Sequence, residues 1–172
     1  MNKKDIEALP YRLSAGIALF NRDGRVWIGS RSDKDAEGEG DGNWWQMPQG
    51  GIDKDEEPFL AALRELYEET SVKSVSLIRE APEWFAYDLP ADLVGQSWKG
   101  RYRGQKQKWF ALRFTGKESE IDVRHPGGGK HKSEFSEWRW EKLERLPELI
   151  VPFKRKVYVE VARVFADIGA AT

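Results

Sequence analysis

The chain has 172 residues, 40% of them hydrophobic and 33% charged, which is typical of one soluble globular domain and not of a disordered or fibrous protein. The net charge of −1 argues against a general polycation for nucleic acid, and the absence of cysteine excludes disulfides and cysteine-bound metals and fits a cytoplasmic location. No apolar run reaches the roughly 20 residues that span a bilayer, and the N-terminal sequence lacks a signal-peptide core, so we expect no membrane partner.

The first part of the chain predicts strands followed by one helix. Residues 11–20 and 25–31 predict a hairpin with Asp-Gly in its turn. Residues 32–43 are polar and glycine-rich, which indicates a surface loop, and 44–48 predict a short apolar strand. After a turn at Gly50 and Gly51, residues 56–70 predict the strongest helix, because Pro58 suits a first turn and apolar residues recur at helical spacing.

The second part predicts more strands and a terminal helix. Residues 74–80, 83–89, 106–114 and 136–140 read as strands, and 125–132 as a flexible loop. Residues 152–168 predict an amphipathic helix with one apolar stripe. The predicted fold class is therefore α/β, a single domain over residues 1–172 in which a mixed sheet lies between helices in an α/β/α sandwich.

Charge is distributed unevenly along the chain. Residues 93–117 contain seven basic residues and no acidic one, whereas 53–57 and 65–69 are acidic. A protein with both features could bind a metal ion and a polyanion together. The alternative is two solvated surfaces with no ligand.

The predicted central helix places Glu65, Glu68 and Glu69 on one face. Like charges at this spacing repel each other, and near the helix C-terminus they also oppose the helix dipole. Arg64 is the only cation in this helix, so a further cation is expected. A hard divalent ion, Mg²⁺ or Mn²⁺, fits carboxylate ligands; the alternative is a solvated acidic face.

The surrounding residues favour the metal. The chain reads Gly50-x5-Glu56-x7-Arg64-Glu65-Leu66-x-Glu68-Glu69-x-Ser71-Val72. This spacing resembles the Nudix box, which has the pattern G-x5-E-x7-R-E-U-x-E-E-x-G-U, at every position except Ser71. The chain is thus similar to Nudix hydrolases, which cleave nucleoside diphosphates linked to another group. A glycine at position 71 would adopt a left-handed cap conformation, so serine there is expected to cost about 1 kcal/mol.

The resemblance implies a role for each residue of the box. Glu65, Glu68 and Glu69 would be metal ligands, with Gly50 offering its carbonyl oxygen. Glu56 would support the metal site, and Arg64 would orient the glutamates. The general base that accepts a proton from water would be Glu65 first and Glu134 second.

Further segments resemble one Nudix subgroup, the bacterial RNA pyrophosphohydrolases and the related asymmetric diadenosine-tetraphosphate hydrolases. They are residues 45–53, 104–110, 134–140 and 151–158. This likeness implies that Glu134 is a further metal ligand. It also implies that the following residues contact the phosphates, the base or another part of the substrate: Arg12, Arg31, Tyr87, Gln105, Lys106, Lys108, Val151, Phe153 and Lys154.

The resulting hypothesis is a Mg²⁺-dependent hydrolase that converts 5′-triphosphate RNA to 5′-monophosphate RNA. It would also split diadenosine tetraphosphate into ATP and AMP, and a monomer is favoured. One alternative is an enzyme acting chiefly on dinucleoside polyphosphates, ADP-ribose or nucleoside triphosphates. Another is a catalytically silent module that binds nucleotide or RNA.

Overall fold

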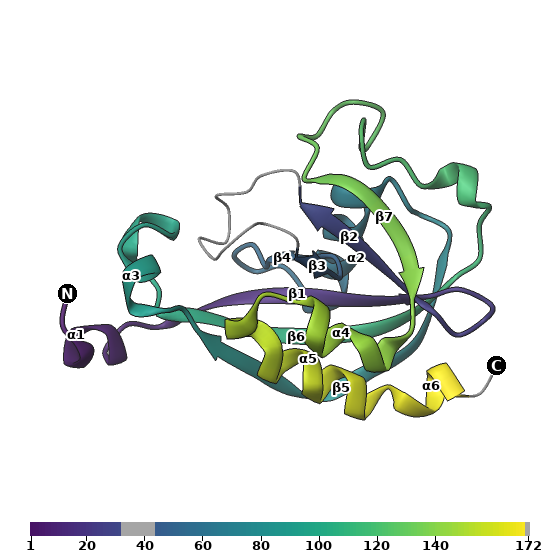
Figure 1. The fold of residues 1–172 in the computed structure, drawn as a ribbon. Coiled ribbons are helices and arrows are strands. Elements are labelled where there is room, and N and C mark those ends of the chain that lie inside the picture. Colours follow the sequence, from purple (N-terminus) through teal and green to yellow (C-terminus); the bar gives the residue numbers. More distant parts are fainter. Residues whose placement is uncertain (32–43, 171–172) are drawn as a thin grey trace.

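The computed structural model describes residues 1–31 and 44–170. Within these residues, seven strands form one mixed sheet, in the order β3-β2-β1-β6-β5 with β4 paired to β1 and β7 paired to β2 (Figure 1). Helices lie on both sides of the sheet, which confirms the predicted α/β layered architecture. The strands are β1 (Tyr11–Phe20), β2 (Val26–Arg31), β3 (Trp45–Gln46), β4 (Gln49–Gly51), β5 (Val75–Asp88), β6 (Gly104–Phe114) and β7 (Phe135–Glu141).

Strand β1 is the centre of the sheet. It pairs in parallel with β6 along its length, but it pairs with β2 only where Phe20 faces Val26. Residues Ser14 to Gly16 of β1 pair instead with β4. The glycine segment predicted as a turn is therefore a short strand between the diverging β1 and β2.

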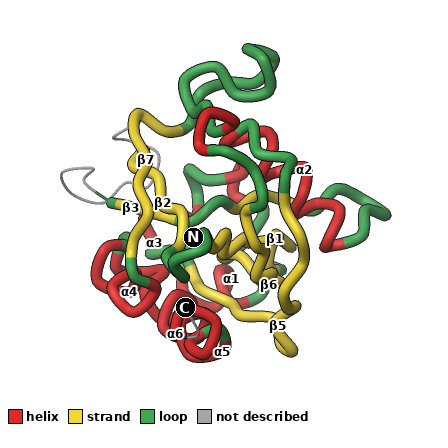
Figure 2. The backbone as a smooth tube through the Cα atoms, turned by 90° about the vertical axis from the view of Figure 1, so that its right-hand side faces the viewer, coloured by secondary structure: helices red, strands yellow, loops and turns green. Residues whose placement is uncertain are grey.

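Helices lie on both faces of the sheet (Figures 1 and 2), and each face carries an apolar core. Helix α2 (Pro58–Thr70) covers one face of the sheet, where Leu66 packs in a cluster with Trp27 and Phe110. On the other face, α4 (Leu146–Leu149), α5 (Arg155–Val164) and α6 (Ala166–Ala170) cover a cluster that contains Trp109 and Phe165. The helices therefore bury both faces of the sheet, and α2 lies in an outer layer with the Glu68 side chain 31% exposed.

Several elements differ from the sequence-based expectation. The two strands expected over 74–80 and 83–89 form one strand, β5, whose register with β6 shifts twice. Pro82 lies at the second shift, where it has no N–H to donate to the ladder. The terminal helix is divided into a 3₁₀ turn (Pro152–Lys154), α5 and α6, because Phe165 leaves helical geometry.

Three short α-helices were not predicted, α1 (Lys3–Glu7), α3 (Ala91–Val94) and α4. The loop predicted over residues 32–43 lies outside the described residues. Among those described, no helix combines the length and apolar character required to cross a lipid bilayer.

Candidate active site

A cavity of about 490 Å³ opens where β4 and the C-terminal half of α2 meet the segment between β5 and β6. It gathers most of the predicted site residues from distant parts of the chain. Those that line it are Gly50, Glu65, Glu68, Glu69, Glu134, Arg12, Arg31, Tyr87, Gln105, Phe153 and Lys154. The lining therefore combines an acidic wall, made of Glu65, Glu68, Glu69 and Glu134, with cations and aromatic rings.

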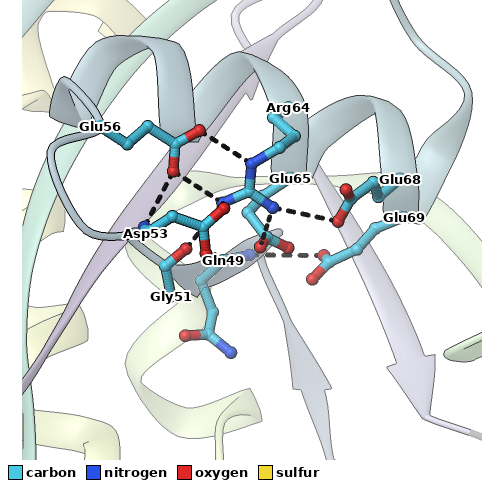
Figure 3. Close-up of polar contacts among 8 residues, drawn as sticks. All are labelled: Gln49, Gly51, Asp53, Glu56, Arg64, Glu65, Glu68 and Glu69. Atoms are coloured by element: carbon cyan, nitrogen blue, oxygen red, sulfur yellow. Dashed lines mark hydrogen bonds and ion pairs between the residues drawn. The ribbon is translucent and has the colours of Figure 1, made fainter.

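Arg64 organises the acidic wall from behind (Figure 3). Its Nε donates to Oε2 of Glu56 and its Nη2 to Oε1 of the same carboxylate, both at 2.9 Å. Its Nη1 donates to Glu65 at 2.8 Å and to Glu68 at 3.2 Å, and Nη2 also reaches the carbonyl of Gly51 at 2.8 Å. The hydrogen bond from Arg64 lowers the pKa of Glu56 to about 2, so this pair stays charged near neutral pH.

The carboxylates that face the cavity are in an unfavourable electrostatic environment. Glu69 is 2% exposed, and its burial, together with the negative charges of Glu134 and Glu65, raises its pKa well above the usual range. Burial also raises the pKa of Glu65 to about 7, against the opposing effect of Arg64 and with repulsion from Glu68 and Glu134. A cation bound in the cavity would remove this repulsion.

The oxygen atoms present suit a hard divalent cation. Within the described residues, no three acidic or histidine side chains are gathered as a ready metal cluster. Arg64 holds one oxygen of Glu65 and one of Glu68, and the backbone N–H of Gln49 lies 3.3 Å from Oε2 of Glu69. Each of these three carboxylates retains a second oxygen with no hydrogen-bond partner in the described part of the chain.

Gly50 provides space beside these oxygens. A Cβ atom at this position would collide with the Glu65 carboxylate, so only glycine allows the backbone of β4 to lie against it. Carboxylate and backbone oxygens are the ligands that Mg²⁺ and Mn²⁺ prefer. The acidic wall therefore fits the predicted divalent ion.

A connected group of polar side chains from β5 and β6 also borders the cavity. Oε1 of Gln105 accepts hydrogen bonds from the Tyr87 hydroxyl at 2.9 Å and from Nε2 of Gln107 at 3.1 Å. These two hydrogen bonds fix the orientation of the Gln105 amide in the lining of the cavity. Beside it, the Lys154 ammonium lies 5.5 Å from the centroid of Tyr87 and 6.0 Å from that of Phe153.

Three predicted substrate contacts do not line the cavity. Lys106 and Lys108 alternate with Gln105 and Gln107 along β6, so they point to the opposite face of the sheet. Lys108 lies 3.7 Å from Glu80 in an ion pair there. Val151 is 1% exposed and packs in the core under α5. The structure therefore does not support these residues as cavity contacts.

Sequence reasoning also missed part of the cavity. Its wall includes Gln49, Gly51, Leu89, Leu93, Gln96, Ser97 and Trp98. Gln49 and Gly51 adjoin the recognised glycine, so their proximity was a usable signal. The residues from 89 to 98 had no signal, since their place depends on how the β5–β6 connection folds back over the site.

Comparison with known proteins places this geometry in a family. A model of the NUDIX domain matches residues 10–161. The chain belongs to the Nudix family. An RNA pyrophosphohydrolase from Bradyrhizobium sp. (strain ORS 278) is 60% identical over 163 residues, which cover 95% of this chain and 96% of that protein.

Solved structures with the same fold have distant sequences. A dihydroneopterin triphosphate pyrophosphohydrolase from E. coli superposes with a TM-score of 0.63 at 19% identity, covering 88% of this chain and 95% of that one. An Ap4A hydrolase from C. elegans superposes with a TM-score of 0.58 at 14% identity, covering 90% and 98%. Nudix hydrolases act with divalent cations, in agreement with the donor set of the acidic wall.

The one departure from the family pattern, Ser71, is the second-last residue of the Nudix box. Ser71 has φ 70° and ψ 2°, the left-handed geometry expected for the missing glycine. Its hydroxyl donates to the carbonyl of Asp122 at 3.1 Å and accepts from the backbone N–H of Gly127 at 2.9 Å. These bonds tie the end of α2 to the glycine-rich loop and offset the backbone strain.

Substitutions at position 71 are expected to separate strain from hydrogen bonding. Ser71→Ala keeps the left-handed strain and loses both bonds, so the protein should lose roughly 1–2 kcal/mol of unfolding free energy. Ser71→Gly loses the same bonds but removes the left-handed strain, which is worth about 1 kcal/mol. Ser71→Ala should therefore be less stable than Ser71→Gly. Urea denaturation of both variants and the wild type measures this difference, and equal stability of the two variants would contradict it.

The raised pKa values of the acidic wall predict a pH-dependent effect of metal. Below about pH 4.5, Glu65 is protonated in both the folded and the unfolded chain, so its shift has no effect on stability. As pH rises toward 7, the unfolded chain releases a proton that the folded chain retains, and the metal-free protein loses stability. Divalent cations should therefore raise Tm by roughly 5 °C at about pH 8 and by less at about pH 5.5.

Thermal unfolding with Mg²⁺, Mn²⁺ or EDTA tests this expectation. A monovalent salt of equal ionic strength is the control, because screening alone would act at both pH values. An equal rise in Tm at both pH values would contradict the link to the buried carboxylates.

Proposed function

We propose that this chain is a Mg²⁺-dependent Nudix hydrolase that removes pyrophosphate from 5′-triphosphate RNA and also cleaves diadenosine tetraphosphate to ATP and AMP. The observation that carries this proposal is that the acidic wall lines the same cavity as Arg12, Arg31 and Lys154. A polyphosphate substrate needs both kinds of group. Its oxygens bind cations, and its hydrolysis needs a carboxylate as base. The 60% identity to a protein named an RNA pyrophosphohydrolase supports RNA as the first substrate.

We assign the metal to Glu65, Glu68, Glu69, Glu134 and the Gly50 carbonyl, with Mn²⁺ as a substitute for Mg²⁺. When bound, the ion would neutralise phosphate oxygens and make water a stronger nucleophile. Arg64 holds Glu65 and Glu68 in place through its hydrogen bonds.

In the proposed reaction, a carboxylate oxygen of Glu65 accepts the proton of the attacking water. The water oxygen forms a bond to phosphorus and the anhydride P–O bond breaks, so pyrophosphate leaves. Glu65 lines the cavity, so its carboxylate lies within the proposed substrate site. Glu134 is the second candidate for this base.

Arg12, Arg31 and Lys154 would hold the phosphates, and Phe153 would offer its ring to a base. The amide of Gln105 would donate to the substrate. The single-domain organisation, the monomeric state and the cytoplasmic location remain predictions.

The decisive test compares kcat/KM for 5′-triphosphate RNA, diadenosine tetraphosphate and ADP-ribose in the presence of Mg²⁺. We expect the RNA to be the best substrate, with pyrophosphate and 5′-monophosphate RNA as products. A preference for diadenosine tetraphosphate or ADP-ribose would transfer the main activity to that substrate. Absence of phosphate or pyrophosphate release from all of them, with Mg²⁺ or Mn²⁺, would leave a silent binding module.

A further inference from the structure

The connection between β5 and β6 carries a strained turn to the edge of the cavity. Trp98 has φ 46° and Lys99 has φ 59°, both in the left-handed region, and Gly100 follows with φ 72°. This region is disfavoured for residues other than glycine. Strain of this kind persists where surrounding contacts hold it, and it clusters at binding sites.

The turn directs the Trp98 indole toward Arg12. Trp98 lines the cavity beside Gln96 and Ser97. The guanidinium carbon of Arg12 lies 5.3 Å from the centroid of the indole, as in a cation–π contact. Tyr102 packs edge-on against the same indole, with the two ring centroids 6.2 Å apart.

Gly51 holds Arg12 from another side. A Cβ atom at Gly51 would collide with Nη2 of Arg12, so the guanidinium lies directly on the backbone of β4. That backbone is connected to the acidic wall through Arg64. The Gly51 carbonyl accepts a hydrogen bond from Arg64 at 2.8 Å, and Arg64 also donates to Glu65 and Glu68. Arg12 is thus confined between Trp98 and the first residues of the Nudix box.

The guanidinium of Arg12 keeps its donors available. In the described part of the chain no carboxylate pairs with it, whereas Arg64 binds Glu56, Glu65 and Glu68. A ring face and a glycine backbone restrict where a guanidinium lies without occupying its N–H groups. An oriented cation with free donors at a cavity suits a phosphate group.

We propose that Trp98 is a positioning residue that holds Arg12 in the orientation that binds a phosphate of the substrate. The inference rests on the proposed function, because it concerns the same cavity and the same polyphosphate. In this proposal, the strained turn is what brings the aromatic face of Trp98 over Arg12. A base stacked directly on Trp98 is the competing explanation.

Steady-state kinetics with a 5′-triphosphorylated oligoribonucleotide and with diadenosine tetraphosphate test the proposal. Trp98→Ala and Trp98→Leu should raise KM about tenfold and change kcat less than about twofold, because the contact acts in the ground state and the transition state alike. Trp98→Phe, which keeps an aromatic face, should stay within about threefold of wild type. Leucine controls for lost packing volume, since it fills space without a π-face.

A double-mutant cycle shows whether Trp98 acts through Arg12. In an Arg12→Ala background, Trp98→Ala should raise KM no further. Additive increases would overturn the proposal in favour of direct base stacking, and an unchanged KM in Trp98→Ala would overturn it outright. Wild-type protein without turnover on either substrate would refute the proposed function itself, a result distinct from both.

Lys99→Gly is the matched control for the turn. It relieves strain beside Trp98 and leaves the indole in place, so Tm should rise while KM stays at the wild-type value. A KM increase in this variant equal to that of Trp98→Ala would assign the effect to the backbone of the turn and overturn the role of the indole.

Discussion

Glu69→Gln is expected to abolish turnover while the protein remains folded. The side chain is 2% exposed and lies near Glu65 and Glu134, so its charge is unfavourable unless a cation is bound. Glutamine has nearly the same shape and still offers an oxygen to the N–H of Gln49, but it cannot supply an anionic ligand. A loss of several kcal/mol of transition-state stabilisation corresponds to a fall in kcat of about 10³-fold or more.

Stability should change in the opposite direction. Because glutamine removes a buried charge, the metal-free variant should unfold at or above the wild-type Tm near neutral pH. The variant should also lose most of the Tm rise that Mg²⁺ causes in wild type. These two measurements separate a lost ligand from a damaged fold.

Glu57→Gln is the matched control for this substitution. Glu57 precedes the same helix, is exposed, and makes no side-chain cap hydrogen bond. It should retain wild-type kcat and the wild-type response to Mg²⁺. Full activity in Glu69→Gln would refute the assignment of this carboxylate to the metal.

The acidic wall was predictable because its geometry is local. The spacing of Glu65, Glu68 and Glu69 fixes their direction on any helix, and the structure brings all three to one cavity. Arg64 lies one residue before Glu65 and one helical turn before Glu68, so its hydrogen bonds to both are also local. Glu134 depended on the resemblance alone, since it lies far along the chain.

The part of the cavity lined by β6 and by the β5–β6 connection was less predictable, because it depends on long-range packing. Strand alternation placed Lys106 and Lys108 on one face of β6, but it could not say which face borders the cavity. Gln105 and Gln107 take that face, since they pair with Tyr87 and Gln49 across strands. Trp98 was missed because its position depends on two left-handed residues that no sequence pattern indicates.

Arg64→Lys is expected to lower both stability and activity. Lysine keeps one positive charge but cannot reproduce the paired hydrogen bonds to Glu56 or reach Glu65, Glu68 and the Gly51 carbonyl together. The side chains of Arg64 and Glu56 are 29% and 18% exposed, so the lost contacts are partly buried. We expect a loss of roughly 3 kcal/mol in unfolding free energy and of about 10–100-fold in kcat.

The pH dependence of this loss identifies its cause. Arg64 lowers the folded-state pKa of Glu56 to about 2, from an ordinary value of 4.5. The resulting stabilisation is present above pH 4.5 and disappears as pH falls toward 2. The stability difference between wild type and Arg64→Lys should therefore be largest near neutral pH and shrink in acid.

A double-mutant cycle with Glu56→Gln measures how much of the stability loss depends on the Arg64–Glu56 pair. If the guanidinium acts chiefly through Glu56, Arg64→Lys should cost less in the Glu56→Gln background than in wild type. Urea denaturation between about pH 7 and about pH 3 measures the stability cost of Arg64→Lys in each background and its dependence on pH. A stability difference that stayed constant over this range would assign the loss to the packing of the guanidinium, because packing does not titrate with Glu56.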